Sequence, residues 1–150
     1  AQYYREAFDL GEREDAYAFN NWAVACLLLE RIDATYATGD WHAALAELCE
    51  RQIVATRRAL EESPQLWLAT GLADLQIVRL LLAAQDRGRC EQIGRAAAEQ
   101  YAAAFARGAS PREISSIQEH LDFLVELTGD AASPWPTVVR TALAQIRRTM

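Results

Sequence analysis

The sequence predicts a single all-α domain over residues 1–150, built from about seven helices. Three observations support this prediction. Apolar side chains recur every three or four residues through most of the chain, which is the spacing of one buried helix face. No stretch shows the alternation of apolar and polar residues that is typical of a half-buried strand. Glycines and Ser-Pro pairs separate the periodic segments, as they do at helix ends.

The first part of the chain predicts three helices. A helix over about 2–10 ends at Gly11, because glycine readily adopts the backbone conformation that closes a helix. A second helix over about 15–31 carries apolar residues on two lines, which predicts burial against two neighbours. Asp40 is a suitable N-cap for a long third helix over 41–62, since its carboxylate can accept backbone N–H bonds.

The middle of the chain predicts the most buried helix. Ser63 and Pro64 provide an N-cap and a first helical residue for a fourth helix over about 65–84. Its apolar residues cover almost the whole circumference, which predicts a central position. A polar break at 86–88 precedes a fifth helix that runs to about Arg107.

The C-terminal part predicts two further helices. Gly108 closes the fifth helix, and Ser110-Pro111 repeats the cap-plus-proline start of a helix. The sixth helix has one narrow apolar stripe. A loop over 129–133 then leads to a seventh helix over about 136–148, which we expect to act as a terminal cap.

Two residues of the central helix carry specific expectations. Trp67 is expected to be buried, so that Trp67→Ala would lower the free energy of unfolding by about 3–5 kcal/mol. Asp74 lies on an otherwise apolar helix, where an unpaired carboxylate is costly. Two interpretations stay open for Asp74: a structural pair with an arginine or a hydroxyl group of a neighbouring helix, or a ligand contact.

The charge of the chain argues against nucleic acid and membrane partners. The net charge is −6, the pI is about 4.9, and all 15 basic residues are arginine. Binding to phosphates or anionic lipid needs clustered basic residues, so neither partner is expected. The longest apolar run, over 22–29, is too short to span a membrane. The arginine and alanine bias is typical of GC-rich bacterial genomes.

The cysteines indicate a reducing cytoplasm. Cys26, Cys49 and Cys90 are an odd number at wide spacing, each within a helical pattern, where a free cysteine behaves as a small buried hydrophobe. No signal peptide is recognisable. The first residue is Ala1 and not Met, which is compatible with a domain cut from a longer protein.

No pattern in the sequence predicts a catalytic, metal or cofactor site. His42 and His120 are the only histidines, and neither stands at a metal-ligand spacing. We expect His42 to be exposed and His120 to be half-buried with a bond to a carbonyl. A pair of Cys49 and His42 would lack the third, orienting group that nucleophilic catalysis needs. No glycine-rich loop indicates a nucleotide site.

Several segments share the aromatic, small and turn residues of one helical-hairpin repeat. They are 5–10, 19–25, 39–44 and 59–64, together with Trp67, Gly71, Ala97, Tyr101 and Ala104. In these segments the chain resembles tetratricopeptide (TPR) repeats, over most of its length, although the intervals exceed the usual repeat of about 34 residues. The resemblance implies antiparallel hairpins stacked as a short right-handed α-solenoid. In its general residue pattern, the chain also resembles divergent repeat modules of bacterial signalling and conflict proteins. In those proteins the modules accompany protease or nucleotide-signalling domains.

The resemblance implies that the first helix of each hairpin lines a concave face that binds peptides. If the second, fourth and sixth helices hold this place, a set of residues on them is expected to contact a partner. The set comprises Asn20, Asn21, Val24, Leu27, Gln65, Leu68, Leu72, Ser115, Gln118 and Asp122. The residue that matches the TPR pattern is Asn21, for which either a contact with the ligand main chain or a buried capping or inter-helix bond is expected.

The sequence therefore predicts a cytoplasmic, non-catalytic scaffold that binds a peptide or a partner protein, without a cofactor. The alternative is a ligand-sensing regulatory domain that controls an attached effector, such as a protease or a nucleotide-signalling domain.

Overall fold

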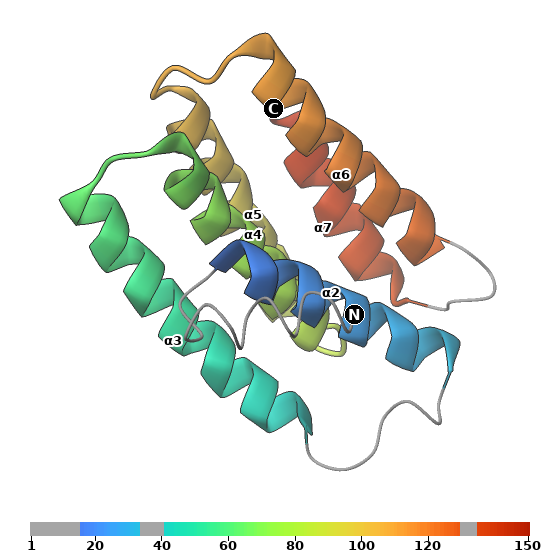
Figure 1. Cartoon of the computed structure of the whole chain (residues 1–150). Helices are drawn as coiled ribbons and strands as arrows, with labels where there is room; N and C mark the ends of the chain where they lie inside the picture. The colour runs from blue at the N-terminus through green and yellow to red at the C-terminus, as the bar shows by residue number, and fades with distance from the viewer. Residues whose placement is uncertain (1–15, 34–40, 130–134) are drawn as a thin grey trace.

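The computed structural model describes residues 16–33, 41–129 and 135–150, and within these ranges the regular structure is entirely α-helical (Figure 1). The helices are α2 (Ala16–Ile32), α3 (Trp41–Glu62), α4 (Leu66–Leu82), α5 (Arg87–Phe105), α6 (Pro111–Gly129) and α7 (Thr137–Arg148). The all-α prediction is confirmed for the described residues. The predicted helix over 2–10 lies outside them.

The helix ends follow the local signals in the sequence. The Asp86 side chain accepts a bond from the Arg89 backbone N–H (3.0 Å) and caps α5. Before α6, Ser110 and Glu113 form a reciprocal capping box: the Glu113 carboxylate accepts from the Ser110 N–H (2.8 Å), and the Ser110 hydroxyl accepts from the Glu113 N–H (3.3 Å). Gly108, with a φ of 105°, follows the end of α5. The helix bounds consequently differ from the prediction by only one or two residues.

Helix α4 holds the centre of the molecule. It contacts α2, α3 and α5, and Figure 1 shows it between α3 and α5 with α2 crossing in front. Most of its side chains are buried, which explains why its sequence is apolar almost all round. The prediction of a central fourth helix is confirmed.

Trp67 departs from that prediction. It lies in the first turn of α4, on the face that lines a pocket, and is 58% exposed. The expectation of a buried ring was therefore wrong.

We now expect Trp67→Ala to change the free energy of unfolding by about 1 kcal/mol or less, as for other surface truncations. Denaturant unfolding of both proteins measures this difference. A loss of about 3 kcal/mol would instead place the ring in a packed interior.

The C-terminal helices form a second layer. Helix α7 packs against α5 and α6, and its buried side chains are Val139, Ala142, Leu143 and Ile146. The contact with α5 is close, since a Cβ atom added to Gly94 would lie 3.1 Å from the Ala142 Cβ. An ion pair between Arg147 and Asp122 (2.9 Å) joins α7 to α6. The predicted right-handed solenoid of repeats stays a prediction.

Among the described helices, none combines the length and the apolar character that a membrane span requires.

Candidate binding pocket

A pocket with a volume of about 670 Å³ lies between α2, α3, α4 and α6. Helix α4 contributes the largest share of its wall, and each of the other three helices adds at least three residues. The pocket therefore depends on the tertiary packing of four helices and not on one local segment.

One face of α4 carries the main pocket residues. Trp67, Gly71 and Asp74 are spaced by four and three residues, which places them on one side of the helix, and all three line the pocket. Gly71 keeps this face open, because a Cβ atom added there would have Thr56 Cγ2 at 4.0 Å as its nearest neighbour. Space is thus left between the indole ring and the carboxylate.

Asp74 is held by a hydroxyl group from the neighbouring helix. The Tyr101 hydroxyl on α5 donates a hydrogen bond to Asp74 Oδ1, and the Tyr101 ring is fully buried. Burial raises the pKa of Asp74 from 3.8 to about 6, and the bond from Tyr101 acts in the opposite direction. Burial and the Asp74 charge raise the pKa of Tyr101 well above its ordinary value. The interpretation of Asp74 as a structural pair with a hydroxyl group is confirmed, and the same residue also lines the pocket.

Two asparagines of α2 also line the pocket. Asn20 is only 6% exposed; its Nδ2 donates to the Gly71 carbonyl (3.4 Å), and its Oδ1 has no hydrogen-bond donor. Asn21 is partly exposed, and its Nδ2 donates to the Tyr17 carbonyl in its own helix (2.9 Å). Of the bonds expected for Asn21, neither a buried cap nor an inter-helix bond is present among the described contacts.

The mouth of the pocket carries aromatic rings. Tyr17 from α2 is 68% exposed, and Trp67 from α4 is also exposed. His120 from α6 is exposed and makes no hydrogen bond within the described part of the chain, so the expected half-buried bond to a carbonyl is wrong. Partial removal of water lowers the pKa of His120.

The predicted contact residues divide into three groups. Asn20, Asn21, Val24, Gln65 and Leu68 line the pocket. Leu27 and Leu72 are buried and belong to the hydrophobic core. Ser115, Gln118 and Asp122 of α6 do not line the pocket, and Asp122 pairs with Arg147 instead.

Other pocket residues were not predicted as contacts. On α6 the pocket is lined by Ile117, which belongs to the apolar stripe, and by Ser116 and His120, which lie on the flank opposite Gln118. Thr56 comes from α3, which would be the second helix of a hairpin, away from the concave face, if α2, α4 and α6 are the first helices. For the residues that were predicted as contacts, binding of a partner stays a prediction.

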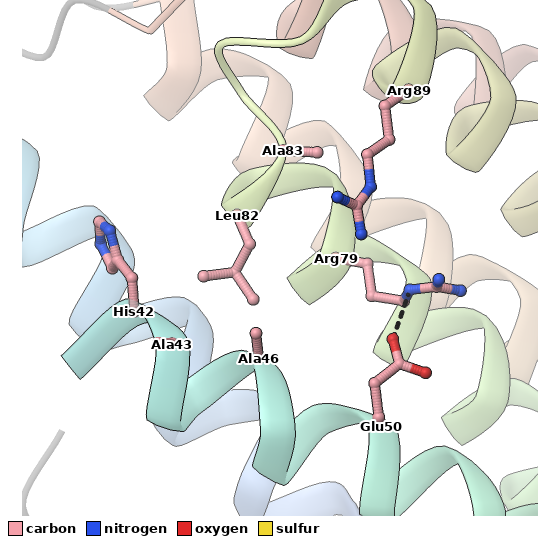
Figure 2. A pocket seen from close by; sticks show the side chains of 8 residues that line it. All are labelled: His42, Ala43, Ala46, Glu50, Arg79, Leu82, Ala83 and Arg89. Atoms are coloured by element: carbon pink, nitrogen blue, oxygen red, sulfur yellow. Dashed lines mark ion pairs between the residues drawn. The ribbon is translucent and has the colours of Figure 1, made fainter. Parts of the chain in front are cut away.

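A smaller pocket of about 240 Å³ lies between α3, α4 and α5 (Figure 2). An ion pair between Arg79 and Glu50 (3.0 Å) closes one side of it. On the other side, the exposed His42 pairs with Glu30 of α2 (2.6 Å). The small pocket has about a third of the volume of the large one, and its lining residues Arg79 and Glu50 already pair with each other.

Cys49 is a core residue and not a nucleophile. Its side chain is fully buried, its thiol donates to the Leu75 carbonyl (3.6 Å), and burial raises its pKa to about 12. Cys26 and Cys90 are likewise buried. Among the described residues, no group of three or more His, Cys, Asp or Glu side chains is arranged to hold a metal ion.

The chain matches no protein-family model, no curated protein and no solved structure. No function is therefore carried over from a relative, and the pocket itself is the basis for assigning one.

Proposed function

We propose that this chain is a non-catalytic binding module that holds a segment of a partner protein in the pocket between α2, α3, α4 and α6. The observation that carries the proposal is the coincidence, in one pocket of about 670 Å³, of exposed aromatic rings with amide groups of the kind that bond a peptide backbone.

The exposed rings support a protein partner. Tyr17 and Trp67 leave large apolar surfaces in water at the mouth of the pocket, where a partner would cover them. Aromatic residues in such positions are frequent anchors of protein interfaces. Asn21 and Gln65 add polar groups at the same mouth.

The helical-repeat resemblance also supports the proposal. Helices α2, α4 and α6 all contribute to the pocket, as expected if they are the first helices of three hairpins around a concave face. We extend the proposal to this arrangement: a short, irregular TPR-like stack whose hollow side receives the partner.

Peptide binding to the Trp67→Ala variant tests the proposal. Fluorescence polarisation with a library of short labelled peptides is expected to find sequences that bind the wild-type protein. Trp67→Ala should weaken them about tenfold or more, because loss of an aromatic anchor costs about 2 kcal/mol. Phe123→Ala is the matched control, since Phe123 is 55% exposed on α6 but outside the pocket. Equal binding by both variants would contradict the proposal.

A second function has its own observation. The pocket volume falls within the range of small-molecule sites, about 300–1,000 Å³. This favours a regulatory domain whose pocket senses a metabolite and acts on an attached effector. Calorimetry with a panel of metabolites, run beside the peptide library, separates the two: saturable binding of a small molecule without any peptide hit would support the regulatory domain.

A further inference from the structure

Resting on the proposed function, we propose that the partner segment inserts a lysine side chain into the pocket, where its ammonium group binds the Asp74 carboxylate and Asn20 Oδ1 beside the Trp67 ring. The charges, the hydrogen-bonding groups and the shape of the pocket each support this assignment.

Among the described residues that line the pocket, Asp74 carries a carboxylate and none carries a guanidinium group. Within the described residues its partner is the neutral Tyr101 hydroxyl, and no ion pair involves it. A carboxylate withdrawn from water without a positive partner is destabilising, and the raised pKa of Asp74 reflects this. A positively charged ligand would supply the missing charge.

The pocket also has a buried hydrogen-bond acceptor, Asn20 Oδ1, to which no described group donates. Asn20 is almost completely buried, its nitrogen is bonded to the Gly71 carbonyl, and its Oδ1 is left without a partner. That bond fixes Asn20 to the turn of α4 that precedes Asp74. An ammonium group has three donors and no acceptor, so it matches a site formed by an amide oxygen and a carboxylate oxygen.

The geometry at Asp74 favours an ammonium over a guanidinium group. The Tyr101 hydroxyl bonds Oδ1, and Oδ2 accepts no hydrogen bond from the residues that the structure describes. A guanidinium group binds best with two parallel bonds to both oxygens, whereas an ammonium group acts as a point charge. Trp67, two helical turns away on the same face, offers its ring to the methylene stem or to the cation.

The lysine does not come from these 150 residues. All 15 basic residues among these 150 are arginine, so a second copy of this sequence has no lysine to insert. The net charge of −6 favours a partner segment of opposite charge.

The test uses four pools of short acetylated and amidated peptides that differ only in a fixed central residue. These residues are lysine, arginine, Nε-acetyl-lysine and norleucine. At neutral pH the wild-type protein should bind the lysine pool at least about tenfold more tightly than the acetyl-lysine and norleucine pools, a difference of about 1.4 kcal/mol. The arginine pool should fall between them. n-Butylammonium chloride should compete with the lysine pool only weakly.

Three variants accompany the wild-type protein. Asp74→Asn should abolish the preference for lysine while leaving the acetyl-lysine pool unchanged, because the amide oxygen can still accept the Tyr101 bond and keep the fold. Glu91→Gln is the matched control, since it neutralises an exposed carboxylate that pairs with Arg87 on α5, away from the pocket. It should bind like wild type. Trp67→Ala should weaken the lysine pool about tenfold or more, as for the peptides above.

The outcomes separate this inference from the proposed function. Equal binding of all four pools, or an unchanged lysine preference in Asp74→Asn, would overturn the lysine assignment while peptide binding stands. Tighter binding of arginine than lysine would overturn the choice of an ammonium group. Tight, Asp74-dependent binding of n-butylammonium without peptide binding would show that the ligand is a small amine and not a partner segment. If no pool binds, the proposed function itself is wrong.

Discussion

Replacement of Phe19 by alanine is expected to lower the free energy of unfolding by about 3–5 kcal/mol, the range for aromatic residues truncated in a packed core. Phe19 is fully buried where α2 meets the central core, and its ring makes an edge contact with Trp22 at 6.0 Å between centroids. The loss comprises the transfer of the ring from water and the cavity that remains.

Phe123→Ala provides the control for Phe19→Ala, because it removes the same atoms from an exposed position on α6. Its effect should stay within about 0.5 kcal/mol. Urea unfolding of the two variants and the wild-type protein gives the comparison. Similar losses for both would mean that α2 is not packed on the core as described.

Asp74→Asn is expected to stabilise the protein above pH 6 by about 1–3 kcal/mol. The pKa of Asp74 is 3.8 when the chain is unfolded and about 6 when it is folded, so the folded state retains a proton that the unfolded state has lost between these values. The free energy of unfolding contributed by Asp74 therefore falls as the pH rises from about 4 to about 6. Asparagine is neutral throughout and avoids that loss.

The difference between Asp74→Asn and wild type, followed from pH 4 to 8 by thermal unfolding, measures this contribution. The difference curve is needed because other groups act in the opposite direction; bonds from Ser110, for example, lower the pKa of Glu113. Tyr101 beneath Asp74, and Tyr17 and His120 across the pocket, are the other titratable groups of the site. A difference that stays constant over this range would show that Asp74 ionises as it does in water.

A carboxylate that weakens the fold at neutral pH is hard to explain by stability alone. An asparagine at position 74 would keep the bond with Tyr101 without the buried charge. The presence of aspartate in a pocket therefore supports a role in binding a cation, and the two experiments on Asp74→Asn should show opposite effects: higher stability and weaker binding.

The helix bounds could be predicted because the signals that set them are local. Asp86, Ser110 with Glu113, and Gly108 satisfy backbone groups within one turn, and those interactions depend on neighbours in sequence. The same holds for the central position of α4, which its apolar circumference indicates. Tyr101, one of the residues that carry the repeat resemblance, is buried on α5.

The orientation of the helices could not be predicted in the same way. A helix that is apolar all round gives no indication of the side on which it lines a pocket. Trp67 lies on that side of α4. The apolar stripe predicted for α6 is buried, for example at Ile117, but the sequence does not indicate which side of that stripe faces the pocket. That choice depends on the packing of α6 against α7, so Ser116 and His120 line the pocket in place of Ser115 and Gln118.

The burial of the Cys49 and Cys90 thiols beside α4 has a practical consequence. Cys49 on α3 and Cys90 on α5 each donate to backbone carbonyl groups of the central helix or the turn after it, and neither is accessible to water. A thiol-specific reagent can reach them only when α3 or α5 moves away from that helix. Their modification rates, followed one cysteine at a time by mass spectrometry, would thus report how often each side of the native protein opens, without an added label.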